Sequence, residues 1–134
     1  MTKLVDIEGV GPAYAAKLEA IGVKTTEQLL KDGASPKGRK EVASKSGVSE
    51  TLILKWVNRI DLSRIKGVGS EYADLLEASG VDTVVELANR KPENLVTKMT
   101  EVNEAKKLVR KLPVLSQVQD WVKQAKDLPR AITY

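Results

Sequence analysis

The chain has 134 residues, a common size for one domain, and its 42% hydrophobic and 30% charged residues predict a folded protein rather than a disordered one. The absence of His and Cys excludes a thiolate nucleophile, an imidazole base and an ordinary zinc or haem site. The net charge of +4 is a mild basic bias of the kind that favours nucleic acid as a partner. No apolar run has membrane-spanning length, so we expect a cytoplasmic protein without a membrane partner.

A stretch of 23 residues occurs twice, at a spacing of 58 residues. Residues 7–29, IEGVGPAYAAKLEAIGVKTTEQL, return at 65–87 as IKGVGSEYADLLEASGVDTVVEL, with 13 identities. A Trp-Val pair, followed by Asp-Leu-x-Arg, comes after each copy. We therefore predict two repeat units, 1–64 and 65–134, that form one double-repeat domain.

Local signals in the first copy predict two helices. Pro12 directly follows the Gly-Val-Gly turn and suits the first position of a helix, where a backbone N–H is not needed. Gly22 suits the C-cap of that helix, and Thr25 with Gln28 matches the capping box that begins the next one. The first copy is thus predicted to form a helix, a turn and a second helix.

Similar signals mark the helices farther along the chain. Thr83 with Glu86 repeats the capping box, Ser49 begins SETLILKWVNRI, Pro92 begins PENLVTKMTEV, EAKKLVRKL ends at Pro113, and LSQVQDWVKQAKDL ends at Pro129. No segment alternates polar and apolar residues with a period of two. The predicted fold is therefore all-α, a compact helical domain built from two tandem repeats with extra helices.

The Gly-Val-Gly turn stands before the first helix of each copy. Two glycines around one apolar residue allow positive φ angles, while Val10 or Val68 packs into the core. Backbone N–H groups at the start of the following helix then point outward and favour an anion. The alternative is that the turns serve only to pack two helices closely. Under both interpretations we expect Gly69→Val to unfold the protein.

The pattern apolar-x-Gly-Val-Gly-x-x-Tyr-Ala-x-x-Leu resembles the helix-hairpin-helix motif. Its tandem arrangement is similar to the double helix-hairpin-helix domain of DNA repair and recombination proteins. The whole chain also resembles a bacterial family known as a domain of unknown function with helix-hairpin-helix repeats.

This resemblance implies that backbone amides of the hairpins hold a DNA phosphate. In that superfamily a monovalent cation often lies beside the phosphate, and the sequence leaves its presence here open; no other cofactor is expected. The phosphate-facing elements that correspond by position are the turn glycines, with polar residues nearby as further candidates: Gly9, Gly11, Gly67 and Gly69, then Lys17, Lys24, Lys66 and Ser70.

Two binding functions follow, and no catalytic one. The leading expectation is sequence-independent binding of double-stranded DNA, because no set of base-reading side chains is recognisable. The alternative is a protein-protein interaction or scaffold module, favoured by the acidic residues Glu8, Glu71 and Asp74 close to the turns. Glu19 and Glu77 recur in both copies, but no base or nucleophile accompanies them, so we expect no enzyme activity.

Other charged and aromatic residues have structural explanations that compete with functional ones. The cluster PKGRK is a candidate phosphate-contacting loop, although solvated surface is the commoner role of such a cluster. Lys106, Lys107, Arg110 and Lys111 are predicted to form the densest basic face of a helix. Trp56 and Trp121 could stack on bases, but their aliphatic neighbours favour packing in the core.

Overall fold

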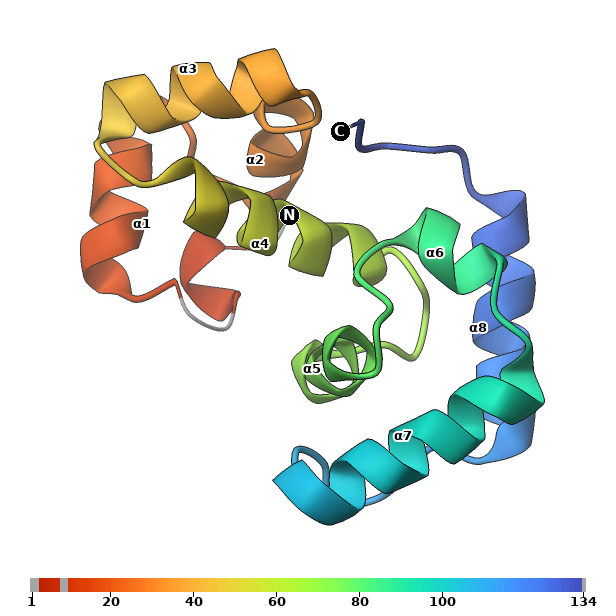
Figure 1. The fold of residues 1–134 in the computed structure, drawn as a ribbon. Coiled ribbons are helices and arrows are strands. Elements are labelled where there is room, and N and C mark those ends of the chain that lie inside the picture. The colour runs from red at the N-terminus through yellow and green to blue at the C-terminus, as the bar shows by residue number, and fades with distance from the viewer. Residues whose placement is uncertain (1–2, 8–9, 134) are drawn as a thin grey trace. The chain divides into compact units, whose positions relative to one another are not determined.

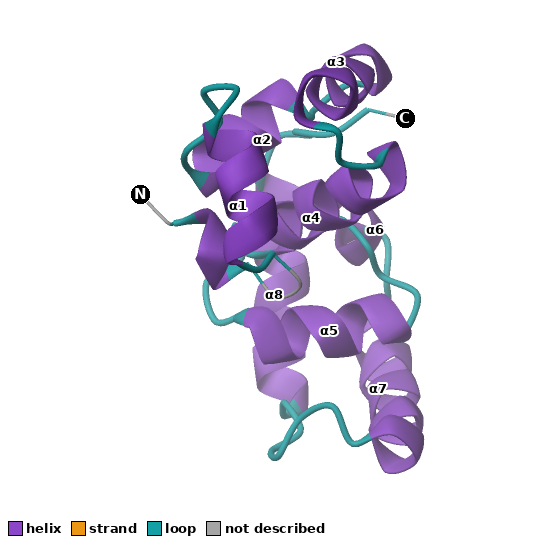
Figure 2. Cartoon of the chain, turned by 90° about the vertical axis from the view of Figure 1, so that its left-hand side faces the viewer, coloured by secondary structure: helices purple, strands orange, loops and turns teal. Residues whose placement is uncertain are grey.

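The computed structural model describes residues 3–7 and 10–133, except for the side chains of Asp6 and Ser70. In this part of the chain the regular elements are all helical, as the sequence predicted (Figures 1 and 2). A short 3-10 helix, Leu4–Asp6, precedes α1 (Pro12–Glu19), α2 (Thr26–Asp32), α3 (Pro36–Ser46), α4 (Glu50–Leu62), α5 (Ser70–Ala78), α6 (Val84–Ala88), α7 (Pro92–Lys106) and α8 (Leu115–Asp127).

The chain divides into two units, each with its own apolar core. The first unit comprises Met1–Asp61 and Ala131–Tyr134, and the second Leu62–Arg130. Helices α1 to α4 therefore belong to the first unit, apart from the last residue of α4, and α5 to α8 belong to the second.

The segment after α8 returns to the first unit, which the repeat alignment did not anticipate (Figure 1). Ile132 is only 3% exposed and lies in the first core. The backbone N–H of Thr133 donates to the carbonyl oxygen of Ala34 at 2.7 Å. The buried guanidinium of Arg39 donates to the carbonyl oxygen of Thr133 at 2.9 Å, so this segment completes the first unit.

The helix boundaries of the two copies have nearly the same geometry. Gly22 and Gly80 follow the first helix of each copy with φ angles of 90° and 92°, as expected of glycine at a helix C-terminus. The side chains of Thr25 and Thr83 accept hydrogen bonds from backbone N–H groups three residues later, at 3.2 and 3.3 Å. Both predicted N-caps are confirmed, whereas the C-cap of α1 is Ala20, and Gly22 lies two residues beyond it.

The two tryptophans occupy equivalent places in the two cores. Trp56 is 1% exposed and Trp121 is 2% exposed. The ring centroid of Tyr14 lies 5.2 Å from that of Trp56, and Tyr72 lies at the same distance from Trp121. The prediction that the tryptophans pack in the core is confirmed, and they offer no surface to a base.

The structure corrects two predictions about basic segments. The PKGRK cluster is the start of α3, not a loop, and Arg39 within it is buried. The helix predicted to continue to Pro113 ends at Lys106, because Lys107 adopts a left-handed conformation with φ of 51°. The Asn103 side chain then accepts from the N–H of Val109 at 3.0 Å and donates to its carbonyl at 3.2 Å. Residues 107–114, which we call the basic loop, are therefore not helical.

Candidate nucleic-acid interface

The second glycine of each turn is the N-cap of the following helix. Gly11 precedes α1 with φ −79° and ψ 176°, and Gly69 precedes α5 with φ −89° and ψ −174°. Neither helix start has a side-chain cap, in contrast to α2 and α6. The first N–H groups of an α-helix have no intrahelical acceptor, so the starts of α1 and α5 offer backbone donors. Pro12 at the first position leaves α1 with one donor fewer.

The glycines of the turns differ in backbone conformation and in the space available for a side chain. Gly67 has a φ of +97°, and a Cβ added to it would lie 3.0 Å from Nε1 of Trp121. Gly69 and Gly11 have extended backbones, and a Cβ on either would meet no atom within 4 Å. The open space at Gly69 gives no steric reason at Cβ for Gly69→Val to unfold the protein. Gly9 lies outside the described residues, as does the acidic Glu8.

The lysine candidates are not gathered at the turns. Lys17 lies in the last turn of α1, with Nζ 5.8 Å from the ring centroid of Tyr14. Lys24 follows the same C-terminal end of α1, and this helix of eight residues spans about 12 Å from the turn. Lys66 is exposed and adjoins Gly67 in the second turn. Ser70 begins α5, but its side chain is outside the described part.

None of these lysines recurs in the other copy. At the repeat spacing of 58 residues, Lys17 corresponds to Leu75, Lys24 to Asp82 and Lys66 to Glu8. Leu75 is fully buried, so its position cannot serve a surface contact in the second unit. The feature shared by both units is the uncapped helix start behind a glycine, not a pattern of cationic side chains.

Asp82 illustrates how far the two copies differ in charge. Partial burial, and then the neighbouring charge of Glu77, raise the pKa of the Asp82 carboxyl above its ordinary value. Folding therefore favours the protonated form, and the ionised carboxylate destabilises the folded state at pH values above that raised pKa.

Asp82→Asn should consequently stabilise the protein near neutral pH, within the roughly 0.5 kcal/mol usual for an exposed substitution. At about pH 3, below the ordinary pKa of Asp, both proteins carry a neutral side chain and the gain should vanish. Thermal unfolding of both proteins at the two pH values, followed by circular dichroism, checks this. An equal gain at both would contradict it.

A hollow of about 380 Å³ adjoins the turn of the second unit. Its lining consists of turn glycines, the first turn of α5 and the basic loop: Gly67, Gly69, Glu71, Tyr72, Arg110 and Lys111. The Tyr72 hydroxyl donates to the carbonyl oxygen of Lys111 at 3.0 Å, which holds the loop beside the helix start. Sequence reasoning missed this association of Arg110 and Lys111 with the turn, because it placed both on a helix.

The Gln124 side chain fixes the backbone of the same turn. Its Oε1 accepts from the N–H of Lys66 at 2.8 Å, and its Nε2 donates to the carbonyl oxygen of Lys66 at 3.1 Å. Trp121, one turn earlier on α8, packs against Gly67. The turn is thus held in place by contacts from α8.

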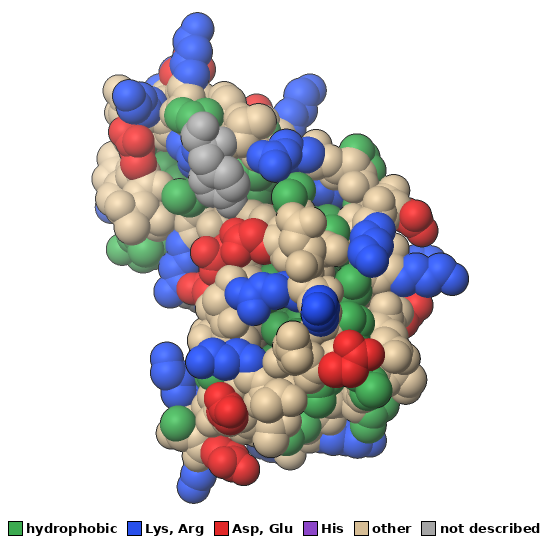
Figure 3. All heavy atoms as spheres, turned by 45° about the vertical axis from the view of Figure 1, so that its right-hand side comes forward, with side chains coloured by type: hydrophobic (Ala, Val, Ile, Leu, Met, Phe, Trp, Pro, Cys, Tyr) green, Lys and Arg blue, Asp and Glu red, His purple; other side chains and the backbone are tan. Residues whose placement is uncertain are grey.

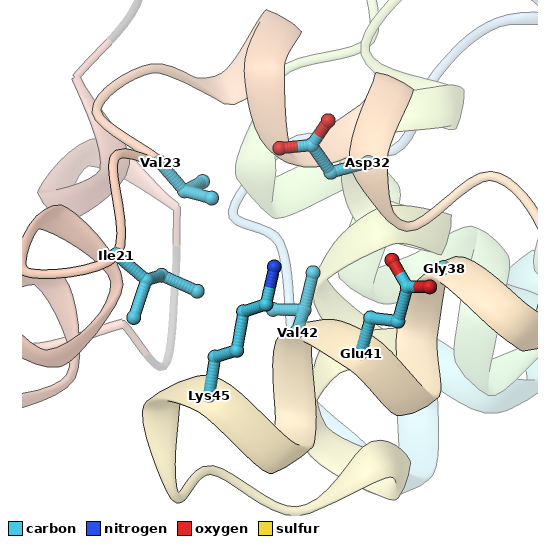
Figure 4. A pocket seen from close by; sticks show the side chains of 7 residues that line it. All are labelled: Ile21, Val23, Asp32, Gly38, Glu41, Val42 and Lys45. Atoms are coloured by element: carbon cyan, nitrogen blue, oxygen red, sulfur yellow. The ribbon is translucent and has the colours of Figure 1, made fainter.

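A second hollow, in the first unit, has a different character. It measures about 190 Å³ and lies between the end of α1, α2 and α3 (Figure 4). Asp32 and Glu41 line it together with one lysine, Lys45, above an apolar floor that includes Val42. Two carboxylates beside a single ammonium disfavour an anion, so this hollow is not a second phosphate site.

The surface as a whole carries both signs of charge. On the face shown in Figure 3, Lys and Arg side chains are interspersed with Asp and Glu. The described residues contain no group of three or more acidic side chains placed to hold a metal ion. Among the described helices, none combines the length and apolar character needed to cross a membrane.

The fold and the site define an all-α protein of two related helical units, each with an uncapped helix start behind a glycine turn. The chain belongs to the family described as Domain of unknown function (DUF4332), which it matches over residues 8–128. Neither the curated proteins nor the solved structures contain a match to it.

Proposed function

We propose that this chain is a non-catalytic module that binds double-stranded DNA independently of sequence, through a helix-hairpin-helix turn in each unit. The observation that carries the proposal is the pair of bare helix starts at Gly11 and Gly69. A side chain would fit at both positions, and Ser, Asp or Asn would cap either helix at least as well. Glycine there leaves the helix amides open to a ligand that comes close to the backbone.

A phosphate oxygen is the natural acceptor for these amides. The helix macrodipole adds a partial positive charge at the same end of the helix, and the two effects together make a helix start an anion site. Contacts of this kind fix a protein on the DNA backbone but do not distinguish bases. Binding should therefore be independent of sequence and should weaken steeply as salt increases.

The proposal does not depend on a cation in the hairpin. In the second turn, the carbonyl oxygen of Ile65 already accepts from the N–H of Val68 at 3.2 Å, and that of Lys66 accepts from Gln124. Each carbonyl oxygen has a second lone pair, so these contacts neither require nor exclude a cation at the turn.

A protein-binding role remains the second candidate, because the hollow of the second unit includes the carboxylate of Glu71. That charge opposes a phosphate and would suit a basic peptide instead. Removal of the Glu71 carboxylate also distinguishes the two candidate functions. It should strengthen DNA binding and weaken the binding of a basic peptide.

Fluorescence anisotropy of a labelled short duplex, titrated with the protein at low and at physiological salt, tests the proposal. We expect micromolar or tighter binding at low salt, equal for unrelated sequences, with a steep dependence on salt. No binding at low salt would remove the DNA proposal and leave protein partners.

Gly69→Ser examines the turn itself. The new hydroxyl can cap the first amides of α5, so the thermal stability should stay the same or rise slightly, while those amides are no longer available to a phosphate. We expect DNA affinity to fall about tenfold without loss of stability. The matched variant in the first unit is Gly11→Ser, and Ser116→Ala on exposed α8 surface is the control. Unchanged affinity in both turn variants would show that the turns do not bind DNA.

A further inference from the structure

One segment of the second unit combines several cations with a complete lack of acidic residues. Of the 22 basic residues, four lie within residues 105–119, which contain no acidic residue and form the longest acid-free stretch of the chain. The other 18 basic residues are matched by 18 acidic ones. This segment therefore carries a charge of +4, whereas the rest of the second unit has an excess of acidic residues.

The basic loop within that segment is an addition that the first unit lacks. Helices α3 and α4 are joined by only three residues, 47–49, whereas α7 and α8 are joined by the eight residues of the basic loop. The flanking helices are equivalent in the two units, since Pro begins both α3 and α7 and a buried Trp lies in both α4 and α8. The two units thus share a scaffold and differ in this cationic connection.

The basic loop is held in a defined conformation. Asn103 binds both backbone groups of Val109, which is 7% exposed, and the Tyr72 hydroxyl binds the carbonyl of Lys111. Leu108 and Leu112 pack against the second core. Arg110 and Lys111, which lie between these two leucines, are exposed and line the hollow beside Gly67 and Gly69.

We propose that Arg110 and Lys111, together with the turn at Gly69, form the principal DNA-contacting surface of the protein, so that the second unit binds the phosphodiester backbone more strongly than the first. This inference rests on the proposed function and assigns it to one unit. A guanidinium can donate two parallel hydrogen bonds to a phosphate, and the lysine adds a point charge. The positive charges of Arg110 and Lys111 offset the negative charge of Glu71. The partial positive charge of the helix start alone would be too small to do so.

A polyanion suits this surface better than a single small anion. The hollow is open to the exposed cations of the basic loop, and the charge extends along the chain to Lys106 and Lys107, which are also exposed. Successive phosphates of one strand can therefore meet successive cations, and each neutralised phosphate releases counterions.

The test compares two double variants that remove the same charge. Arg110→Gln with Lys111→Gln alters the proposed surface. Lys91→Gln with Lys98→Gln alters exposed positions elsewhere in the same unit. Lys91 adjoins Arg90, which bonds to the carbonyl of Gly80 beyond the opposite end of α5. Because all four side chains are exposed, both variants should keep the melting temperature of the unaltered protein within a few degrees.

Anisotropy titrations of a labelled duplex over a range of salt concentrations give the affinity and the salt slope of each protein. The basic-loop variant should bind on the order of tenfold more weakly, with a salt slope smaller by about two units, whereas the control should change little. Glu71→Gln should raise the affinity several-fold, because it removes the carboxylate that lines the hollow.

Equal losses in the two double variants would overturn the inference, since net charge alone would then explain them. Unchanged affinity in the basic-loop variant, with the unaltered protein still bound to DNA, would overturn it while leaving the proposed function intact. If the unaltered protein itself does not bind the duplex, the proposed function and this inference fail together.

Discussion

Trp121→Ala should lower the free energy of unfolding of the second unit by about 3–5 kcal/mol, the usual loss for a large buried aromatic side chain. Trp121 is 2% exposed, and its ring centroid lies 5.2 Å from that of Tyr72. It also packs against Gly67. Removing it leaves a cavity in the core and withdraws support from the turn. Because a single domain is stable by only about 5–15 kcal/mol, this is a large share of the total.

Urea unfolding followed by circular dichroism measures the effect of Trp121→Ala. Gln119→Ala, at an exposed position two residues earlier on α8, is the control and should stay within about 0.5 kcal/mol. Trp56→Ala in the first unit should cause a comparable loss, since Trp56 is equally buried and equally close to Tyr14. A loss below about 1 kcal/mol at Trp121 would contradict its place in the core.

Gly67→Ala should destabilise the protein by about 1–3 kcal/mol, whereas Gly69→Ser should be nearly neutral. At Gly67 the φ of +97° is one that residues with a side chain rarely adopt, and the added Cβ would also lie 3.0 Å from Trp121. At Gly69 the backbone is extended and the space is open. Substitution should therefore be costly at Gly67 and nearly neutral at Gly69.

Thermal and urea unfolding of Gly67→Ala beside Gly69→Ser check this contrast. A large loss in both would mean that the turn needs both glycines for its own conformation, so that glycine at position 69 would be explained without a ligand. Losses below about 0.5 kcal/mol in both would mean that the turn relaxes around a side chain at Gly67.

Helix boundaries could be predicted from the sequence wherever the signal was local. The capping side chains of Thr25, Thr83 and Ser49 bond to backbone groups within three residues, so the pattern of residue types contains the whole interaction. The end of α7 could not be predicted in this way. It depends on the bonds of Asn103 to Val109, six residues on, and residues 104–113 taken alone read as a helix with an apolar and a basic face.

The candidate site also has features that depend on local sequence and features that depend on contacts between distant segments. The duplicated Gly-Val-Gly turn and the position of each following helix are properties of short segments, and the sequence by itself determined them. It could not separate Gly67 from Gly69, because only Gly67 has a positive φ and only a side chain there would meet Trp121, more than fifty residues away in the chain.

Only the tertiary structure decided which cations adjoin a turn. Lys17 and Lys24 are close to the first turn in sequence, but the length of α1 carries Lys24 to its far end. Arg110 and Lys111 are about forty residues from the second turn, yet they line its hollow because the Tyr72 hydroxyl and the apolar residues of the basic loop hold them there. Backbone donors follow from local conformation, whereas the charges around them depend on contacts between segments distant in the chain.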